Sequence, residues 1–221
     1  MITPSVYSGR PLLILDGDLP SEKIMRELIL EHSPLIAADG AAAQLRNYKI
    51  RPDIIIGDFD SLGDERFDPF FAGTELIEDK SQQTYDGEKC LAWILNAGHN
   101  RVMVVGVGGG MIDHVLNNFS LLAKFADKLS ISTRQEDSIG YLVTSSLSIG
   151  TNPGERISLI PLPAAQLQTE GLEWNLEGEE LSLGRREGGS NRAVGSEVRV
   201  DVATQIPPGC VALFHYPLVS E

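Results

Sequence analysis

The sequence predicts an α/β fold, with an N-terminal parallel-sheet catalytic domain followed by a smaller all-β sandwich. Three observations predict it. Short apolar runs alternate with amphipathic stretches over residues 12–127, helical periodicity fades after residue 127, and short strand-like runs separated by turns fill the last third. We therefore expect one domain over residues 1–127 and a second over residues 128–221.

In the first domain, strands are expected where short runs are apolar throughout, because parallel strands are covered on both faces. Helices are expected where apolar residues recur at helical spacing. Ser21 stands where it could cap the first of them. The predicted strands are 12–15, 35–38, 54–56, 76–77 and 102–107, and the predicted helices are 21–32, 40–48, 86–97 and 111–126.

The second domain is expected to contain only strands and turns. Turn signals rich in Gly and Pro stand at 152–154, 161–163 and 188–189. The spacing of the runs between them suits a small sandwich or barrel. The predicted strands are 141–143, 157–160, 181–183, 198–202 and 211–214.

The composition of the 221-residue chain argues against several classes of protein. No apolar run approaches the roughly 20 residues of a membrane span, and the first residues lack the order of a signal peptide. We therefore expect a cytoplasmic protein with no membrane partner. The formal charge of −13 argues against a nucleic-acid partner, because affinity for phosphate backbones comes mainly from Lys and Arg.

The two cysteines, Cys90 and Cys210, lie far apart and form no Cys-x-x-Cys pair. This spacing predicts neither a disulfide framework nor a zinc site. Both residues are expected to be buried as small hydrophobic side chains.

Carboxylates follow the predicted strands of the first domain, where ligands of open parallel sheets bind. So many acids at one edge need a cation, and oxygen ligands of this kind suit Mg²⁺ carried with substrate phosphates. The other interpretation is that these residues simply form turns. The acids are Asp16 and Asp18 after the first strand, Asp39 after the second, Asp58 and Asp60 after the third, and Asp79 after the fourth.

For Asp16 and Asp18 both interpretations stay open. For Asp58 and Asp60 the segment Gly-Asp-Phe-Asp-Ser favours a metal. Alternate residues of an extended segment point the same way, so both carboxylates would face one spot.

A glycine stretch over residues 106–110 follows a predicted strand and precedes a helix. Its backbone amides could approach a phosphate, with help from the helix dipole. It matches neither a Walker A loop nor Gly-x-Gly-x-x-Gly, so a plain flexible turn is an equal alternative. Asp113 and His114 stand in the first turn of the next helix, and His114 could equally be a core or capping residue.

A third group of residues opens the helix predicted over 86–97. An acid such as Asp86 is favoured there by the helix dipole and needs no further function. Lys89 stands one turn later and could reach a phosphate.

Together these segments resemble the thiamine pyrophosphokinase (thiamine diphosphokinase) family. The Gly-Asp-Phe-Asp-Ser element and the order of the segments are specific, whereas the glycine stretch alone is not. The matching segments are Ala-Asp-Gly-Ala at 38–41, Pro-Asp at 52–53, Gly-Asp-Phe-Asp-Ser at 57–61, Asp86 with Lys89, Gly-Gly-Gly at 108–110 with Asp113, His114 and Asn117, Ile-Ser-Leu-Ile-Pro at 157–161, Gly-Leu-Glu-Trp at 171–174 with Leu176, and Ser190-Asn191.

The resemblance implies a homodimer with active sites between subunits, which transfers a diphosphoryl group from Mg²⁺-bound ATP to thiamine. It assigns metal and phosphate duties to Asp39, Asp58, Asp60 and Asp86, and Asp58, Asp60 and Asp86 are the expected metal ligands. Asp39 could complete the metal shell in place of Asp86, or one of these two could accept the hydroxyl proton. Further residues follow from the same resemblance: nucleotide-side contacts from Gln82, Lys89, Gly108, Gly109, Gly110, Asp113 and His114, and thiamine contacts from Ser190 and Asn191. Trp174 is expected in the core of the β domain.

Two positions depart from the family pattern. Tyr85 stands where the family usually has Thr, and Met111 stands where it has Arg. The missing guanidinium removes a fixed charge, which could change the donor, the acceptor or the activity. Arg101, Lys80 and Lys124 are candidates to replace that charge.

The expected reaction is in-line attack by the thiamine hydroxyl on the β-phosphorus, with release of AMP. One alternative is a pyrophosphokinase acting on another hydroxyalkyl heterocycle, such as a pterin. A second is a thiamine-binding relative without turnover. The retained acids favour an enzyme, because a mere binding protein would have little use for them.

Overall fold

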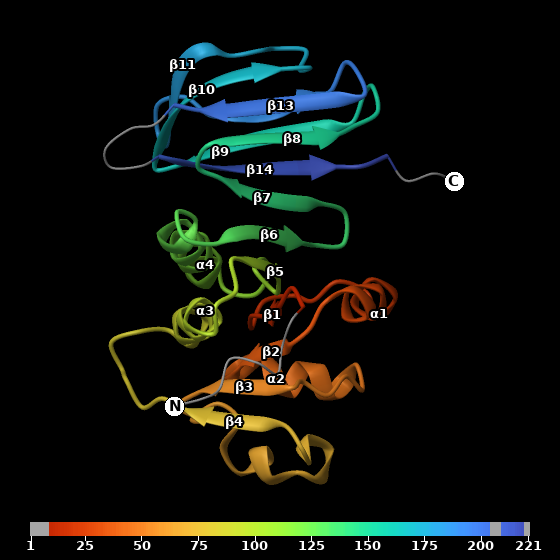
Figure 1. Cartoon of the computed structure of the whole chain (residues 1–221), viewed down its shortest axis with the longest axis vertical. Coiled ribbons are helices and arrows are strands. Elements are labelled where there is room, and N and C mark those ends of the chain that lie inside the picture. Colours follow the sequence, from red (N-terminus) through yellow and green to blue (C-terminus); the bar gives the residue numbers. More distant parts are fainter. Residues whose placement is uncertain (1–8, 204–208, 219–221) are drawn as a thin grey trace. The chain divides into compact units, whose positions relative to one another are not determined.

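The computed structural model describes residues 9–203 and 209–218. The chain divides into two compact units (Figure 1). The first comprises the residues up to 121 together with 133–136, and the second comprises residues 122–132 together with those from 137 onward.

The first unit contains a parallel sheet of five strands in the order β5-β1-β2-β3-β4. Its strands are β1 (Leu12–Ile14), β2 (Leu35–Ala38), β3 (Ile54–Gly57), β4 (Glu75–Glu78) and β5 (Arg101–Val105). Its helices are α1 (Glu22–Glu31), α2 (Asp39–Asn47), α3 (Asp86–Asn96) and the first part of α4 (Ile112–Phe125), with 3-10 turns η1 (Gly63–Phe67) and η2 (Pro69–Phe71).

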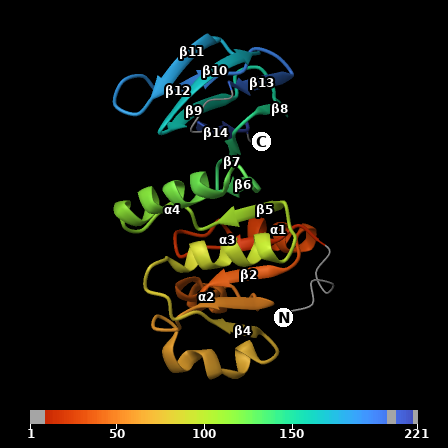
Figure 2. The same ribbon diagram turned by 60° about the vertical axis from the view of Figure 1, so that its left-hand side comes forward.

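Helices cover both faces of this sheet, with α1 and α2 on one and α3 on the other (Figures 1 and 2). Side chains alternate across each strand, so Leu12 and Ile14 of β1 face the core that contains Met25 of α1 and Leu45 of α2. Strands β1 to β3 and β5 are almost wholly buried, as their continuous apolar runs predict.

The second unit is a sandwich of two antiparallel sheets, ordered β12-β9-β14-β7 and β11-β10-β13-β8. Apolar residues from both sheets form one core, for example Leu159 and Leu213 from one sheet with Leu167 and Val200 from the other. The fold class predicted from the sequence is confirmed. The strands are β7 (Ile139–Val143), β8 (Ser146–Gly150), β9 (Arg156–Leu162), β10 (Ala164–Glu170), β11 (Glu177–Ser182), β12 (Gly188–Arg192), β13 (Glu197–Val202) and β14 (Cys210–Tyr216), while β6 (Ser130–Arg134) is divided between the units.

Several local predictions are wrong. The turn predicted at 188–189 lies in strand β12, which is held by pairing with β9 although it contains no apolar residue. Pro161, predicted in a turn, lies inside β9. Ser21 makes no side-chain capping bond to α1. The sequence interpretation also omits β6, β8 and β10, and η1 and η2.

A buried polar network lies where the end of β14 pairs with the start of β9. The Glu155 carboxylate accepts hydrogen bonds from the Asn152 backbone and side chain and from the Leu218 amide, and it lies 2.7 Å from His215 Nε2. Although burial acts to raise the pKa of Glu155, these hydrogen bonds outweigh it and lower the pKa to about 2. The network ties β14 to the turn before β9.

Cys90 and Cys210 are free and buried, which confirms the prediction made for them. Among the described residues, no helix is long and apolar enough to cross a membrane.

Candidate functional site

The candidate site lies at the carboxyl edge of the parallel sheet. After β1 the chain adds β2, β3 and β4 on one side, and β5 then pairs with the other side of β1. Such a reversal is a topological switch point, where the loops after the strands part and leave room for a ligand.

Asp39, the first residue of α2, anchors the site. Its side chain is fully buried, and its two carboxylate oxygens accept hydrogen bonds from the amides of Ser61 (3.2 Å) and Leu62 (3.1 Å). Burial raises the pKa of Asp39, and the nearby charges of Asp86 and Asp60 add to this, while the two amide bonds oppose it. Asp39 thus fixes the loop after β3.

That loop is a tight turn. Phe59 has a φ of +62°, which is unusual for a residue with a bulky side chain, and its ring is buried in the core of the first unit. The sequence prediction of an extended segment is therefore wrong here. The buried Phe59 ring anchors the turn to the core, and Asp58 and Asp60 lie on either side of Phe59 in the turn.

Gly57 separates two of the acids. A Cβ on Gly57 would lie 2.4 Å from Asp39 Cβ and 3.1 Å from Asp86 Oδ2. Any side chain at this position would push the carboxylates of Asp39 in α2 and Asp86 in α3 away from the end of β3. The loop therefore needs glycine where β3 ends.

Asp39, Asp58 and Asp60 each place a carboxylate oxygen within 4.8 Å of the other two. Such a set of hard oxygen donors fits a divalent cation such as Mg²⁺. Asp58 accepts hydrogen bonds from the Asp60 amide and from Gln82 Nε2 (2.8 Å), and these, the amide bond first, lower its pKa. Asp58 is therefore held as an anion ready to bind a cation.

Asp86 joins this group from the start of α3. Its Oδ1 accepts a hydrogen bond from Lys89 Nζ at 2.9 Å, and Nζ also donates to the carbonyl of Asp79. Burial raises the pKa of Asp86, with Lys89 opposing it. Burial acts to lower the pKa of Lys89, but the bond and charge of Asp86 outweigh it and raise that pKa. The ammonium group neutralises part of the acidic cluster.

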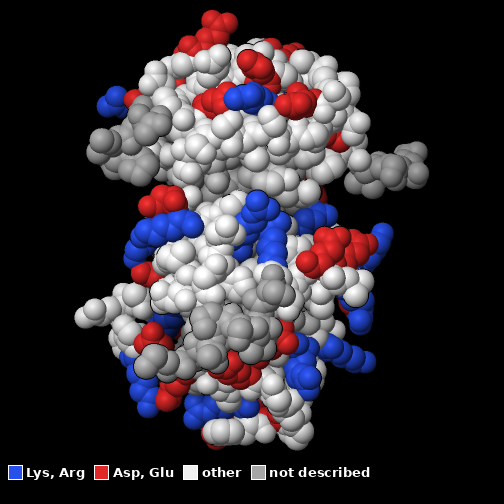
Figure 3. All heavy atoms as spheres, viewed as in Figure 1, with Lys and Arg blue, Asp and Glu red and all other residues white. Residues whose placement is uncertain are grey.

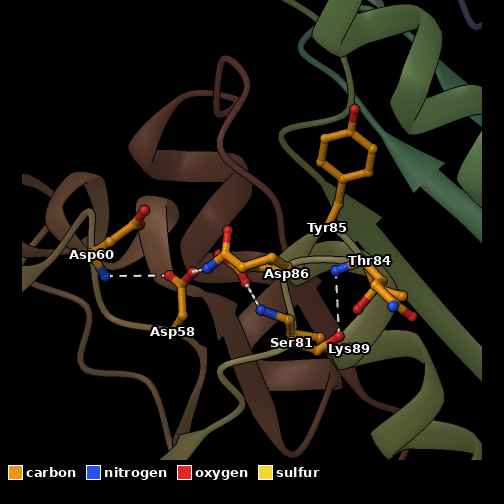
Figure 4. Close-up of a pocket in the computed structure, with 9 residues that line it drawn as sticks. Asp58, Asp60, Ser81, Thr84, Tyr85, Asp86 and Lys89 are labelled. Atoms are coloured by element: carbon orange, nitrogen blue, oxygen red, sulfur yellow. Dashed lines mark hydrogen bonds and ion pairs between the residues drawn. The ribbon is translucent and has the colours of Figure 1, made fainter.

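Asp58, Asp60, Asp86 and Lys89 line a pocket of about 370 Å³, which we call the acidic pocket (Figure 4). Its full lining is Asp58, Asp60, Ser81, Gln82, Gln83, Thr84, Tyr85, Asp86 and Lys89. Lys89 is the one permanently cationic residue among them, and it is already paired. The carboxylates of this pocket would therefore repel an anionic ligand unless a cation accompanied it.

The glycine stretch packs against the loop after β1. The amides of Gly17 and Asp18 donate to the carbonyls of Gly106 (2.9 Å) and Gly108 (2.7 Å). A Cβ on Gly106, whose φ is +71°, would lie 2.1 Å from the Leu15 carbonyl oxygen. Close backbone packing accounts for this glycine, whereas a Cβ on Gly110 would meet nothing within 4 Å.

A second pocket, of about 210 Å³, lies at the switch point. We call it the switch-point pocket; it is lined by Leu15, Asp16, Gly17, Ala38, Gly40, Ser61, Tyr85, Asp86, Gly87, Gly109, Gly110, Met111, His114 and Asn118. It shares Tyr85 and Asp86 with the acidic pocket, so the two adjoin.

Of the other residues predicted in the first unit, some line the switch-point pocket and some line neither pocket. Asp16 lines the switch-point pocket, where Gln44 donates to it, whereas Asp18 packs against Gly109. His114 is exposed and lines that pocket, so the core reading of it is wrong. Neither Asp113 nor Gly108 is among the residues that line either pocket.

The predicted thiamine pair belongs to the second unit. Ser190 is exposed, with a φ of +61°. Asn191 is buried, and its amide is bonded to the backbone N–H and carbonyl of Trp174. Trp174 is 60% exposed, so the prediction that it lies in the core is wrong. Asn191 positions the segment that presents this indole ring.

One positioning residue carried no signal in the sequence. Arg46, in the last turn of α2, pairs with Glu65 of η1 (2.7 Å) and with Asp68, which lies between η1 and η2. Asp39 and Arg46 thus hold the segment after β3 from both ends of α2. Such pairing across a fold cannot be read from local sequence.

Three basic residues were candidates to replace the arginine of the family pattern. Of these, only Lys80 lies near the carboxyl edge of the parallel sheet, where the candidate site is. Arg101 begins β5 and Lys124 lies in the last turn of α4, so each is at the far end of its element. Lys80 follows β4, with its side chain 77% exposed and 3.5 Å from Glu78.

On the face of the molecule drawn in Figure 3, acidic and basic side chains lie interspersed.

Comparison with known proteins places the chain in one family. The model described as "Thiamin pyrophosphokinase, catalytic domain" matches residues 25–133, and "Thiamin pyrophosphokinase, vitamin B1 binding domain" matches residues 145–206. Thiamine pyrophosphokinase 2 of Arabidopsis thaliana is 29% identical, over 78% of this chain and 75% of that protein. Thiamine pyrophosphokinase 1 of the same plant is 29% identical, over 71% of this chain and 63% of that protein.

The fold also matches a solved structure. The crystal structure of thiamine pyrophosphokinase from Bacillus subtilis superposes with a TM-score of 0.78 at 20% identity, covering 95% of this chain and 100% of that one. At this identity the match supports the fold.

Replacing Lys89 by Met should lower the free energy of unfolding by about 2–3 kcal/mol, because Asp86 would lose its partner in a largely buried site. Lys80→Met removes the same charge from an exposed pair and should change stability by less than about 0.5 kcal/mol. Urea unfolding of both variants measures the difference. Equal losses would show that the Lys89–Asp86 pair adds nothing beyond a surface contact.

Proposed function

Because the chain belongs to the thiamine pyrophosphokinase family and is an enzyme of that kind, we propose that its acidic pocket is where the diphosphoryl group of ATP passes to thiamine. The observation behind this proposal is the convergence of Asp39, Asp58 and Asp60 beside Asp86 and Lys89. Catalysis of phosphoryl transfer depends on positioning and charge neutralisation. These residues would position the groups and hold the cation that neutralises the phosphates.

In the proposed reaction, the thiamine hydroxyl oxygen forms a bond to the β-phosphorus of ATP. The bond from that phosphorus to the oxygen bridging the α-phosphorus breaks, and AMP leaves with the bridging oxygen. The hydroxyl proton passes to a carboxylate of the cluster or to solvent. The products are thiamine diphosphate and AMP.

The donor set fits Mg²⁺, and we propose that Asp58, Asp60 and Asp86 hold it. Asp86 has its Oδ2 free of the Lys89 bond, which uses Oδ1. Asp39 adds its charge and fixes the loop, since both of its oxygens accept amide hydrogens. A bound Mg²⁺ would neutralise charge that develops on the phosphate oxygens.

The remaining assignments belong to the same proposal. Gln82 and Lys89 line the acidic pocket, which suits contact with phosphates. Gly109, Gly110 and His114 line the adjoining pocket, while Gly108 and Asp113 stand beside them in sequence.

We also propose residues 1–127 as the catalytic domain and residues 128–221 as the thiamine-binding domain. A cytoplasmic location is part of the same proposal, because it suits two free cysteines. No observation favours a pterin substrate or an inactive binding protein.

Asp58→Asn and Asp60→Asn should each lower kcat by at least about 100-fold, since each removes an anionic ligand worth several kcal/mol of transition-state stabilisation. AMP release from ATP in the presence of thiamine measures kcat, and calorimetry with Mn²⁺ measures metal affinity. Asp64→Asn, at an exposed position in η1, is the matched control and should leave both unchanged. Near-normal turnover of Asp60→Asn would overturn the metal assignment.

We propose a homodimer in which Ser190 and Asn191 of one protomer serve the acidic pocket of the other. Asp60→Asn and Ser190→Tyr protomers should each be inactive. Refolding them together should recover roughly a quarter of the wild-type activity, because half the dimers would carry one intact site. Mixed dimers that form without recovering activity would contradict the shared site, and a monomer in sedimentation would contradict the dimer.

A further inference from the structure

The switch-point pocket has an exposed apolar wall. Tyr85 is 65% exposed and Met111 is 60% exposed, and both line this pocket. Large apolar side chains left open beside a concave site mark a place where a ligand removes them from water. The wall is therefore a candidate contact for an apolar part of a substrate.

The Tyr85 ring is held in place. Its hydroxyl oxygen accepts a hydrogen bond from Asn117 Nδ2 at 3.3 Å, and Asn117 lies on α4. Figure 4 shows the ring directed away from Asp58 and Asp60 and toward α4. A small hollow lined by Tyr85, Gly87, His114, Asn117, Asn118 and Leu121 continues on this side. The ring thus presents its surface away from the acids.

The two adjoining pockets differ in character. The acidic pocket contains Asp58, Asp60 and Asp86, which suit a metal and phosphates. The switch-point pocket has the carboxylates of Asp16 and Asp86 and several polar side chains, but it also has Leu15, Ala38, Met111 and several glycines, which the acidic pocket lacks. Because Tyr85 and Asp86 belong to both, a ligand whose phosphates lie in the first pocket can extend its uncharged ring past Asp86 into the second.

The two residues expected to depart from the family pattern, Tyr85 and Met111, both line this pocket. Their exposed side chains give it an apolar and aromatic wall. A tyrosine ring offers a face for stacking, and a thioether packs well against aromatic edges. A flat heterocycle such as a nucleobase matches such a wall. In the proposed function the thiamine ring lies with Ser190 and Asn191 instead.

We infer that Tyr85 and Met111 bind the adenine base of the ATP donor by stacking in the switch-point pocket, and that they set the specificity for the donor. This inference rests on the proposed function of the acidic pocket. Asp86 then lies at the junction between base and phosphates, where both pockets meet.

Tyr85→Ala should raise the KM for ATP about tenfold, within the range that base stacking on an aromatic residue contributes, and should leave the KM for thiamine unchanged. Tyr85→Phe keeps the ring and should stay within about twofold of wild type. Phe67→Ala, which removes an equally exposed aromatic outside both pockets, is the matched control and should change neither KM. Thermal unfolding of each variant checks that the fold persists.

Calorimetry with Mg²⁺ separates this inference from the proposed function. Tyr85→Ala should weaken binding of a non-hydrolysable ATP analogue about tenfold but leave binding of inorganic tripolyphosphate, which has no base, unchanged. Equal losses for both ligands, unchanged analogue binding, or a change in the thiamine KM instead would overturn the inference. Absence of AMP release by the wild-type protein would contradict the proposed function alone, because the binding measurements need no turnover.

Discussion

The two hydrogen bonds from the amides of Ser61 and Leu62 to the buried carboxylate of Asp39 are the constraint on which the site depends. They connect the start of α2 to the loop after β3, and they hold that loop where Asp58 and Asp60 converge. Arg46 fixes the same segment from the other end of α2. A buried charge that accepts two amide hydrogens is stable only while this loop stays in place.

Because the same hydrogen bonds bring the carboxylates together, the site has an excess of negative charge. Asp39, Asp58, Asp60 and Asp86 lie together, and the one buried ammonium, that of Lys89, compensates only part of their charge. In the proposed function, a divalent cation held by these carboxylates would supply the remaining positive charge. The acids that oppose folding when unpaired are therefore those to which the proposed function gives the metal.

Much of the fold could be predicted from local patterns. The buried runs of β1, β2, β3 and β5 and the acids after them are visible in the sequence, because parallel strands are apolar throughout and ligands bind at their carboxyl ends. Strand β10 alternates buried and exposed residues, a pattern that a search for continuous runs misses. Strand β12 has no apolar residue, and its pairing with β9 depends on the rest of the sheet. The turn at Phe59, the ion pairs of Arg46 and the exposure of Trp174 likewise depend on residues distant in the sequence. Local sequence patterns therefore could not predict them.

The most direct test of this account is a crystal structure with Mn²⁺ and a non-hydrolysable ATP analogue, using the anomalous signal of the metal to locate it. The account predicts a peak within ligand distance of Asp58 and Asp60, with Asp39 still bonded to the amides of Ser61 and Leu62. A peak held by other residues, such as Asp16 and Asp18, or a bound nucleotide with no metal at the acidic pocket, would contradict it.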